Sequence, residues 1–446
     1  MKSSFGIAIV GCGTVGNAAA DLLLTEISGY QAKTDTAFKL RALVDVNFDR
    51  ARAAGLDESL FNSDLSEVLA NRDIHLIVET VGGLTIARNI IEKAIKAGKH
   101  VVTANKALLA HYGKELFALA HKNAVCIGFE ASCAGGIPIV RALVDGLIAN
   151  ENEAIYGIVN GTSNFILTEM VEFGKTYTEA LKLAQEAHLA EADPTLDVNG
   201  MDAAHKLTLL SSLAFGEYVT LDAIPVEGIN KLNLFDVKMG SELGYTTKLL
   251  ALARRVNGGL DLAVRPVFLP DNHPLAIVSG PFNAVSVYGN AVGHTMYYGR
   301  GAGGKPTASA VISDILSIAI GTWPRLFSTL HVWPDQCKKA RIASPEESRG
   351  RHYLRFKALD KCGVVADIAA ILARKNVSLN AFVQKETHEG TSTPIVITTH
   401  EAREKDIMDA FNAICQLKTV DEDAVRIRII DEHVESLISE SLDEIR

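Results

Sequence analysis

The first third of the chain alternates short apolar runs with segments of helical periodicity. Apolar runs bounded by glycine or polar residues predict buried strands, and the longer periodic segments predict helices. Strands that alternate with helices are typical of an α/β domain with a doubly wound parallel sheet. We expect this domain to occupy residues 1–135. Its predicted strands are 5–10, 40–45, 75–80, 100–103 and 124–128, with helices at about 15–27, 85–97 and 106–122 and a polar insert near 28–37.

Residues 136–333 mix the two periodicities without regular alternation. This mixture predicts an α+β domain, in which helices cover one face of a sheet. Helical patterns lie near 136–149, 163–174, 177–188, 200–214 and 306–320, and strand patterns near 153–160, 263–269, 283–289 and 293–298.

The last hundred residues follow a different order of elements. Residues 334–351 are polar and charged and are predicted to be a linker. The order βαββαβ that comes next is the ferredoxin-like split arrangement, over residues 352–431. The tail 432–446 is acidic and amphipathic and could form a short helix. The predicted elements of the βαββαβ unit are 352–359, 363–374, 377–386, 392–400, 403–415 and 424–431.

Composition narrows the class of protein. A chain of 446 residues, 48% hydrophobic and 22% charged, is expected to form about three globular domains. A net charge of -9 argues against a nucleic-acid-binding surface. The six cysteines form no CxxC pair, which favours reduced thiols in a cytoplasmic protein. The chain shows no signal-type segment at its start and no apolar run of about 20 residues, so we expect no membrane association.

A glycine-rich turn follows the first predicted strand. Gly11-Cys12-Gly13-Thr14-Val15-Gly16 has the GxGxxG spacing and opens a predicted helix, which is the context of a dinucleotide-binding loop. Gly11 permits the tight turn, Gly13 lets a pyrophosphate approach the backbone, and Gly16 lets helix and strand pack closely. The amides at the start of the helix, from Thr14 and Val15 onward, then face the phosphates. The alternative is a glycine turn that binds no nucleotide.

Asp45 ends the second predicted strand. A carboxylate there can accept a hydrogen bond from the ribose 2′-hydroxyl of NAD and would repel the 2′-phosphate of NADP. It lies 29 residues after Gly16, more than the usual spacing of about 20, and the insert at 28–37 accounts for the excess. This favours NAD without excluding NADP. A strand-end acid that contacts nothing is the alternative.

An acidic segment, residues 191–206, concentrates carboxylates before and inside a predicted helix. Asn199 is a candidate N-cap, and Asp202 and Lys206 are four residues apart, on one helix face. Lys106 follows a predicted parallel strand, and the carboxyl ends of such strands line the ligand crevice. These residues suggest a site for a small polar substrate with a lysine that moves a proton. The plainer alternatives are a capped helix with a surface ion pair and an exposed lysine at a helix start.

Together these motifs resemble the homoserine dehydrogenase family along nearly the whole chain, in order. The 191–206 segment is the most specific match. The C-terminal unit, with Asp360-Lys361-Cys362-Gly363-Val364, resembles an ACT regulatory domain. The other matching segments are Gly11–Gly16, Glu79–Gly83, Thr103–Lys106, Glu130–Pro138, Asn160–Ile166 and Gly301–Ala308.

The resemblance implies NAD(P)-dependent interconversion of L-aspartate 4-semialdehyde and L-homoserine. It assigns Lys206 as the proton donor to the carbonyl oxygen during hydride transfer. Glu191 and Asp202 would hold the substrate, and Asp197 would support the lysine network within that substrate site. Lys106 would lie between nicotinamide and substrate, in contact with both.

The resemblance also implies further cofactor residues, Thr80, His188 and Gly303. In the family a loop binds a monovalent cation, usually sodium, through four backbone carbonyls. The matching loop in this chain is Glu130–Ile137. A glycine-rich hinge without an ion is the alternative for that loop. The cation-binding positions are Glu130, Cys133, Gly135 and Ile137.

Four positions depart from the family pattern. His188 replaces a usual glycine near the cofactor, which puts the cofactor geometry in question. Arg300 stands where proline is common. Cys362 replaces a proline in the ACT loop, which puts the effector response in question. Asp45 stands where NADP-preferring relatives often carry a basic residue.

The ACT resemblance implies feedback inhibition by threonine and a homodimer or homotetramer; a dimerisation module without a ligand is the alternative. Two other functions remain open. One is a different Rossmann-fold dehydrogenase of a small amino-acid semialdehyde; a phosphorylating one would need a nucleophilic cysteine, for which Cys133 is the candidate near the crevice. The other is a non-catalytic amino-acid sensor. A sensor is expected to lose Lys206, Lys106 or Asp202, and all three are present.

Overall fold

The computed structural model describes residues 4–384 and 392–430 and divides into two units. The first unit comprises residues 1–161, 201–224 and 281–340, and the second comprises 162–200, 225–280 and 341–446. The helix expected in the tail 432–446 lies outside the described residues.

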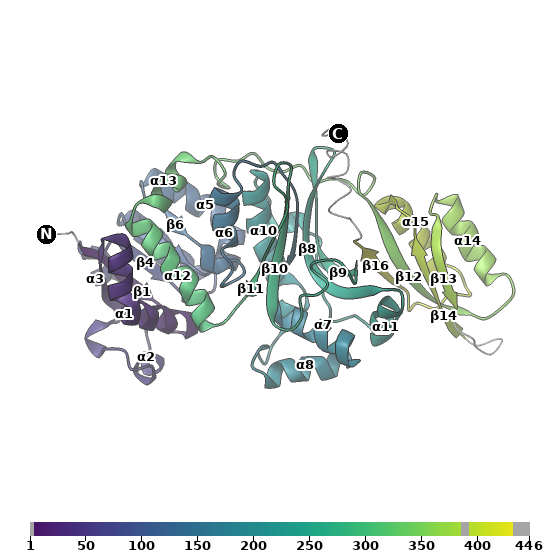
Figure 1. Ribbon diagram of the computed structural model, residues 1–446, viewed down its shortest axis with the longest axis horizontal. Helices are drawn as coiled ribbons and strands as arrows, with labels where there is room; N and C mark the ends of the chain where they lie inside the picture. Colours follow the sequence, from purple (N-terminus) through teal and green to yellow (C-terminus); the bar gives the residue numbers. More distant parts are fainter. Residues whose placement is uncertain (1–3, 385–391, 431–446) are drawn as a thin grey trace. The chain divides into compact units, whose positions relative to one another are not determined.

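The first unit contains the predicted parallel sheet, with strand order β3-β2-β1-β4-β5-β6 (Figure 1). This is the doubly wound order with a switch point between β1 and β4, where a ligand crevice forms at the carboxyl ends of the strands. The strands are β1 (Ser4–Val10), β2 (Ala37–Val44), β3 (Phe61–Asn62), β4 (Leu76–Glu79), β5 (His100–Thr103) and β6 (Ile127–Gly128). The helices are α1 (Thr14–Thr34), α2 (Asp49–Ala53), α3 (Leu65–Ala70), α4 (Thr85–Lys96) and α5 (Lys106–Lys122).

The expected polar insert at 28–37 is mostly helical. Helix α1 continues to Thr34 and ends at Asp35, whose φ of 56° is left-handed. The sequence prediction of a helix ending near residue 27 was therefore wrong. The segment is polar because the far end of α1 is exposed, and the longer helix accounts for the long spacing between Gly16 and Asp45.

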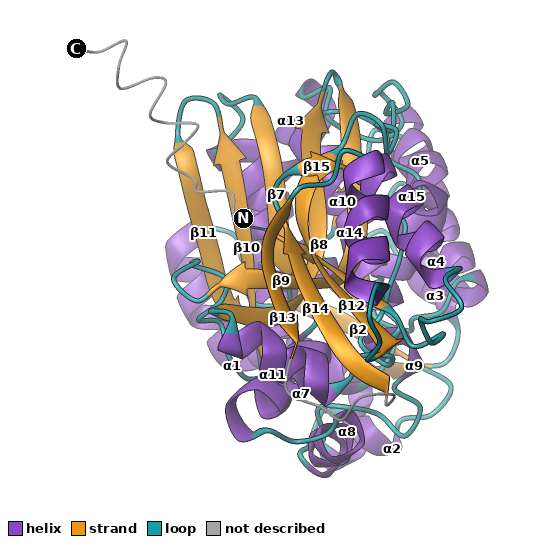
Figure 2. Cartoon of the chain, turned by 90° about the vertical axis from the view of Figure 1, so that its right-hand side faces the viewer, coloured by secondary structure: helices purple, strands orange, loops and turns teal. Residues whose placement is uncertain are grey.

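The rest of the first unit adds three strands that pair antiparallel in the order β11-β10-β7 (Figure 2). Helix α10 is buried along almost its whole length, and α12 runs beside α1 (Figure 1). These elements are α6 (Ile139–Arg141), β7 (Asn152–Ile158), α10 (Met201–Phe215), β10 (Phe282–Gly289), β11 (Gly293–Arg300), α12 (Gly304–Ala319) and α13 (Thr322–Thr329).

The helix predicted at 136–149 is only partly correct. One short α-helical turn, α6, continues as a π-helical turn over Ala142–Gly146, in which the amide of Leu147 donates to the carbonyl of Ala142. Pro138 directly precedes α6, and proline cannot donate into a preceding turn. Helical periodicity in the sequence could not reveal this change of winding.

The second unit contains a mixed sheet with the strand order β8-β9-β16-β12-β14-β13. Its helices are α7 (Gly161–Phe173), α8 (Tyr177–Glu186), α9 (Thr195–Val198), α11 (Leu234–Glu242), α14 (Val364–Arg374) and α15 (Glu404–Cys415). Its strands are β8 (Tyr245–Val256), β9 (Gly259–Pro270), β12 (Arg349–Leu359), β13 (Leu379–Gln384), β14 (Ser392–Thr399), β15 (Ala402–Arg403) and β16 (Val425–Ile429).

Strand β8 was not predicted from the sequence. It pairs antiparallel with β9 along its full length, from Tyr245 opposite Pro270 to Val256 opposite Gly259. The connecting residues Asn257 and Gly258 both have positive φ, 48° and 77°. That is the type I′ hairpin turn, for which Asn-Gly is the strongest short sequence signal.

The predicted βαββαβ unit is confirmed. Helices α14 and α15 cover one face of the β12–β14 pair, where Leu354, Phe356 and Ile397 form a core with Ile368 and Ile407 (Figure 2). Strand β16 joins this unit to the β8–β9 hairpin, because it pairs in parallel with β9. Strand β12 begins at Arg349, inside the segment expected to be a linker.

On the opposite face of that sheet, α11 is tied to β12 by buried charges. Asp236 of α11 is fully buried and accepts hydrogen bonds from Arg355 at 2.6 Å and from Tyr353 at 2.9 Å. Arg355 also contacts Asp423, with its Nη1 2.9 Å from Oδ2. A buried carboxylate of this kind is stable only because a guanidinium and a hydroxyl saturate it.

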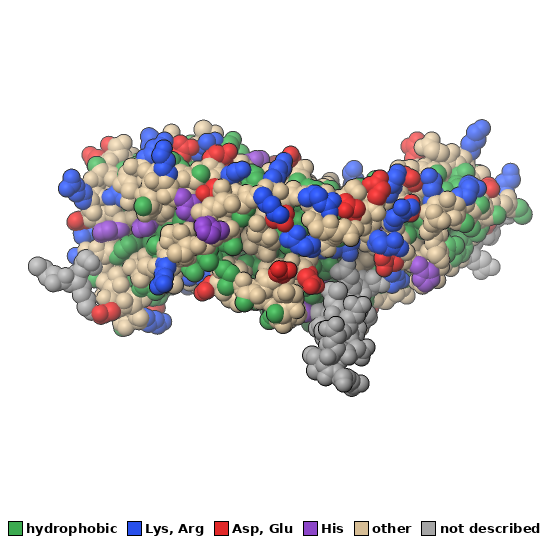
Figure 3. Space-filling view, turned by 90° about the horizontal axis from the view of Figure 1, so that it is seen from above, with side chains coloured by type: hydrophobic (Ala, Val, Ile, Leu, Met, Phe, Trp, Pro, Cys, Tyr) green, Lys and Arg blue, Asp and Glu red, His purple; other side chains and the backbone are tan. Residues whose placement is uncertain are grey.

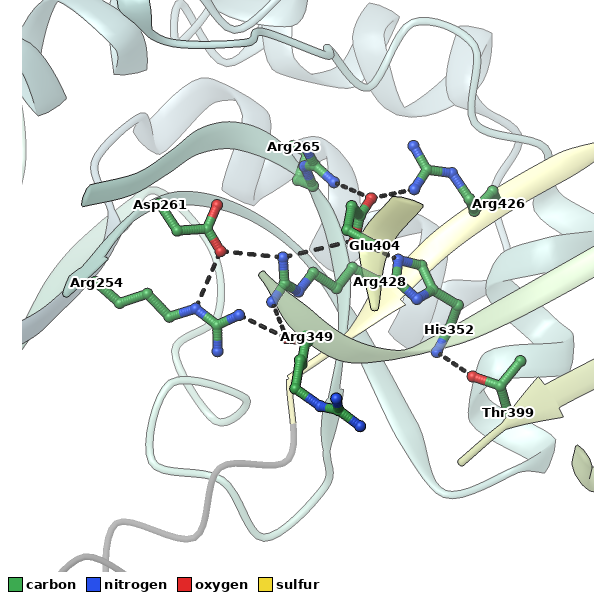
Figure 4. Close-up of polar contacts among 9 residues, drawn as sticks. All are labelled: Arg254, Asp261, Arg265, Arg349, His352, Thr399, Glu404, Arg426 and Arg428. Atoms are coloured by element: carbon green, nitrogen blue, oxygen red, sulfur yellow. Dashed lines mark hydrogen bonds and ion pairs between the residues drawn. The ribbon is translucent and has the colours of Figure 1, made fainter. Parts of the chain in front are cut away.

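A second ionic cluster joins β9, β12, β16 and the start of α15 (Figure 4). Glu404 contacts Arg426 and lies 3.6 Å from Arg265 and 3.2 Å from Nε2 of the fully buried His352. Arg428 lies between two carboxylates, 3.8 Å from that of Glu404 and 3.4 Å from that of Asp261. Asp261, on β9, also pairs with Arg254 at 3.0 Å.

Two further features are the distribution of charge on the surface and the apolar character of the helices. On the face in Figure 3, basic and acidic side chains intermingle over the described residues. Among the described helices, no single one has the length and apolar character to cross a membrane. Helices α12 and α13 together have enough length and apolar character, but the chain bends by 80° between them, and this match rests on length and composition alone.

The buried His352 makes stability depend on pH. Burial lowers the pKa of His352 to about 4, although the neighbouring Glu404 acts in the opposite direction. The unfolded chain would take up this proton near pH 6.5. The stabilisation from a neutral His352 is therefore complete above about pH 6.5 and is lost as the pH falls toward 4, by about 2 kcal/mol at pH 5.

We expect the melting temperature to fall between pH 7 and pH 5, and His352→Gln to reduce that fall. Glu404, whose pKa burial would raise but whose contacts with His352, Arg426 and Arg428 hold it low, adds a loss of stability only at more acidic pH. The matched control is His400→Gln, at an exposed position in the same unit. Equal pH dependence in wild type and His352→Gln would contradict the prediction.

Candidate active site

The glycine-rich loop lies at the switch point of the parallel sheet. Gly11 has φ of 105°, and a Cβ there would lie 2.7 Å from the carbonyl carbon of Thr80. A Cβ at Gly16 would lie 1.9 Å from the carbonyl oxygen of Gly11. A Cβ at Gly13 would meet no atom within 4 Å. Gly11 and Gly16 are therefore required by packing, whereas Gly13 leaves its side of the backbone open.

The start of α1 is suited to bind an anion. Gly13 is the N-cap and offers no side-chain cap, and the first turn carries no acidic residue. Amides at such a helix start point outward with the positive end of the helix dipole. Thr80 Oγ1 donates to the carbonyl of Gly11 at 2.8 Å and fixes the loop against β4. Together with the open side of Gly13, these features fit the pyrophosphate of a dinucleotide.

Asp45 is bonded to the same loop. Its Oδ2 accepts a hydrogen bond from the amide of Cys12 at 2.6 Å, and its Oδ1 accepts from the amide of Val46 at 2.7 Å. It is therefore not a strand-end acid without contacts. A carboxylate can accept further bonds at both oxygens, so this position can still bind a ribose hydroxyl.

A buried network fixes the two strand-end loops next to the glycine loop. Glu79 is fully buried; its Oε2 accepts from Thr103 Oγ1 at 2.7 Å and its Oε1 from the amide of Val81 at 2.8 Å. Asn105 caps α5 by accepting from the amide of Leu108 at 3.0 Å. Asn105 Nδ2 also donates to the carbonyl of Gly83 at 2.7 Å, so the Glu79–Gly83 and Thr103–Lys106 segments are bonded to each other. These contacts hold Lys106 at the first residue of α5.

Asp202 is the centre of the charged cluster that the sequence suggested. It lies in the first turn of α10, and its Oδ2 accepts from Lys206 Nζ at 2.6 Å, one helical turn later. Lys106 Nζ lies 3.1 Å from Asp202 Oδ1. Asn160, which follows β7, donates from Nδ2 to Asp202 Oδ2 at 2.8 Å. Three separate segments therefore meet at one carboxylate.

Burial makes this cluster different from a surface ion pair. Asp202 is 7% exposed and Lys206 is 8% exposed. Burial alone would raise the pKa of Asp202, but the charges of Lys206 and Lys106 and the hydrogen bonds from Lys206 and Asn160 hold it well below its usual value. The alternative of a solvated i,i+4 pair is therefore wrong.

The ammonium of Lys206 has a defined direction. It donates to Asp202 Oδ2 and to the carbonyl oxygen of Val159, each at 2.6 Å. An ammonium has three N–H donors, and among the described residues these are its hydrogen-bond acceptors. The third N–H is thus oriented by the other two. Val159 and Asn160 had not been assigned a role from the sequence, although the Asn160–Ile166 motif had been noted.

The remaining predicted substrate residues belong to the second unit. Glu191 is exposed, and Asp197 is half-buried, with its carbonyl oxygen accepting from Ser163 at 2.9 Å. The sequence predicted Asn199 as the N-cap of the helix that carries Asp202, and this was wrong. Asn199 ends the short helix α9, and α10 begins at Met201. The extra turn was hidden because Pro194 to Asn199 reads as a loop in the sequence.

His188 also belongs to the second unit and has an unusual backbone. It lies just beyond the end of α8 with φ of 54°, in the left-handed region that favours glycine. The usual glycine of the family at this position therefore has a conformational reason. In this chain the side chain of His188 is exposed.

The loop expected to bind a cation is strongly bent. Ala134 and Gly135 both have left-handed φ, 53° and 52°. The buried carboxylate of Glu130 accepts from the amides of Val140 and Arg141, each at 2.9 Å. Among the described residues, no group of three or more His, Cys, Asp or Glu side chains could hold a metal. Of the four backbone carbonyls expected as ligands, that of Glu130 accepts a hydrogen bond from the amide of Cys133 at 3.2 Å, and that of Ile137 accepts one from the amide of Ile139 at 2.8 Å.

Comparison with known proteins identifies the family. Residues 11–130 match the NAD-binding domain of homoserine dehydrogenase, residues 138–316 match homoserine dehydrogenase, and residues 352–416 match the ACT domain. A homoserine dehydrogenase of Neisseria gonorrhoeae is 43% identical over 96% of this chain and 99% of its own length. The chain belongs to the homoserine dehydrogenase family. One of Bacillus subtilis is 36% identical over 93% of this chain and 96% of its own length.

Solved structures agree with the sequence relatives. A homoserine dehydrogenase from Thiobacillus denitrificans superposes with a TM-score of 0.90 at 41% identity, covering 96% of this chain and 98% of that one. A hyperthermophilic archaeal homoserine dehydrogenase in complex with NADPH has a TM-score of 0.59 at 27% identity, covering 70% and 97%. The predicted fold class is confirmed.

The predicted activity is confirmed as well. Homoserine dehydrogenases are NAD(P)-dependent oxidoreductases that act on the alcohol group of homoserine, so this chain is an enzyme of amino-acid biosynthesis with a nicotinamide cofactor and an ACT domain. The comparisons do not support a different semialdehyde dehydrogenase or a non-catalytic sensor.

Proposed function

We propose that Lys206 is the proton donor and acceptor in the interconversion of L-homoserine and L-aspartate 4-semialdehyde. The observation that carries this proposal is the arrangement of its ammonium, which Asp202 and the carbonyl of Val159 hold at 2.6 Å with one N–H left to point at substrate. In the reduction, that N–H would protonate the developing alkoxide, and its charge would stabilise the transition state.

Each other residue of the cluster then has a distinct role. The bound nicotinamide supplies or takes up the hydride. Lys106, 38% exposed at its side chain, would lie between nicotinamide and substrate and orient both. Asp202 would hold the two lysines and bind the substrate hydroxyl or ammonium. Glu191 would bind the substrate ammonium, and Asp197 would support the lysine network.

The cofactor site would include the glycine loop residues Gly11, Gly13, Thr14, Val15 and Gly16, with Thr80, His188 and Gly303. We propose that NAD is preferred over NADP. Asp45 supports this, because its negative charge lies beside the loop that would bind the pyrophosphate, where a 2′-phosphate would be repelled.

We further propose that a monovalent cation such as sodium binds to the carbonyls of Glu130, Cys133, Gly135 and Ile137. Carbonyl oxygens are hard ligands that suit such an ion. Burial and the nearby Asp314 raise the pKa of Glu130 to about 8. An added positive charge next to this buried acidic pair would favour its ionised form.

The ACT unit is proposed to bind threonine and to inhibit the enzyme, within a homodimer or homotetramer. The proposed domains are 1–135 for the cofactor, 136–333 for substrate and dimerisation and 352–431 for regulation, with 334–351 between them and the tail 432–446 outside the described residues. We also propose a cytoplasmic location, since all six cysteines are free thiols.

Lys206→Ala tests the central proposal. We expect kcat to fall by about 10²- to 10⁴-fold, the usual contribution of a general acid, while the Kd for NAD stays near that of wild type. The rate is measured as NADH absorbance with homoserine in alkaline buffer. Lys182→Ala is the matched control, since Lys182 forms an i,i+4 pair with Glu186 that is exposed. Near-normal turnover in Lys206→Ala would remove Lys206 from the mechanism.

Asp45→Asn and Asp45→Ala test cofactor choice. Asparagine keeps an acceptor for the amide of Cys12 but removes the charge, so it separates repulsion of a 2′-phosphate from support of the loop. We expect the ratio of kcat/KM for NAD to that for NADP to fall about tenfold or more in both variants. An unchanged ratio would show that Asp45 does not select the cofactor.

Threonine binding is best tested on the full chain. Removing residues 350–446 would take away β16 and leave the edge of β9 unpaired, so truncation is not a clean control. We expect calorimetric titration to detect threonine binding and the reaction rate to fall with it, with lysine as the control amino acid. Cys362→Pro, which restores the usual ACT loop residue, is expected to tighten binding. No heat of binding with either chain would end the proposal.

A further inference from the structure

Asn283 has an unusual environment for a buried amide. It is the second residue of β10 and is 1% exposed, yet neither its Oδ1 nor its Nδ2 has a hydrogen-bond partner among the described residues. Buried amides in proteins are nearly always bonded, because an unpaired polar group loses its hydration without compensation. By contrast, the buried Asn160 and Asn152 of the same unit both donate from Nδ2, to Asp202 and to the carbonyl of Ala214.

The side chain of Asn283 lies between two glycines. A Cβ built at Gly301 would lie 1.9 Å from Asn283 Nδ2, so only glycine fits there. A Cβ at Gly161 would lie 3.6 Å from Asn283 Oδ1 and 2.8 Å from the carbonyl oxygen of Pro281. A Cβ at Gly301 would also lie 2.4 Å from Asn283 Oδ1, so both polar atoms of the amide face the Gly301 segment, and Oδ1 also faces the Gly161 segment.

Both segments lead directly to the active site. Gly161 follows Asn160, which donates to Asp202 at 2.8 Å. On the other side, Gly301 begins the glycine-rich loop that enters α12. A Cβ at Gly304, the first residue of α12 directly after that loop, would lie 3.4 Å from Cγ2 of Thr14, in the first turn of the cofactor helix α1. Asn283 thus bridges the segment that orients Asp202 and the loop that contacts the cofactor helix.

We propose that Asn283 is a positioning residue for the catalytic complex. Its amide would donate to and accept from the main chain on these two sides when cofactor and substrate bind, and so fix both segments in the reactive geometry. An amide is suited to this role because it has a donor and an acceptor on one rigid plane. Its unpaired state would be relieved in the complex, which favours the bound form over the free one.

This inference rests on the proposed roles of Asp202 and Lys206, but its test can fail independently of the test of those roles. Asn283→Leu keeps the approximate size and removes both polar atoms. Because nothing is lost in the free enzyme, we expect its melting temperature to equal or exceed that of wild type. We expect kcat/KM for homoserine to fall at least tenfold, and the rise in melting temperature on adding NAD to shrink.

Asn283→Ser and Asn283→Ala are a size-matched pair that tests rescue by a hydroxyl. Serine can donate and accept, so it should retain more kcat/KM than alanine. A markedly lower melting temperature of Asn283→Leu without ligand, with unchanged kinetics, would overturn the proposal, because Asn283 would then serve the folded state alone. Unchanged kinetics and unchanged NAD stabilisation in all three variants would overturn it equally. The NAD shift remains informative even if Lys206 proves not to be the proton donor.

Discussion

The candidate active site depends on the contacts of one buried carboxylate, that of Asp202. A charge in this position is costly unless it is paired and hydrogen-bonded. Here two lysine ammoniums and an asparagine amide meet it, and it lies in the first turn of α10, where the helix dipole also favours a negative charge. The contacts that stabilise this buried charge also connect the residues after β5 and β7 to helix α10.

The parallel sheet determines where this cluster can lie. Lys106 follows β5, and the buried Glu79 after β4 holds the neighbouring loop, so both come from carboxyl ends of strands beside the switch point. The glycine loop follows β1 at the same edge. The glycine loop and the lysine cluster therefore come from different segments, yet the glycine loop, Lys106 and Asn160 each lie close to a strand end.

Local patterns in the sequence predicted much of this arrangement. The GxGxxG spacing, the i,i+4 relation of Asp202 and Lys206, and the strand preceding Lys106 are each contained in a few neighbouring residues. The contact of Asn160 with Asp202 joins residues 42 positions apart, and no periodicity encodes it. Strand β8 was missed for a different reason: Leu249–Arg254 suits a helix as well as a strand, and pairing with β9 decides between them. The π-helical turn after α6 likewise depends on packing that the sequence pattern does not contain.

The ionic contacts of the ACT unit limit how it could be exchanged for another. Arg355 and Arg428 belong to that unit, but their partners Asp236 and Asp261 lie more than a hundred residues earlier in the chain. Asp236 is fully buried, so a replacement unit without the arginine and the tyrosine that bind it would leave an unpaired carboxylate inside the protein. An exchanged regulatory unit would therefore have to carry these partner residues with it.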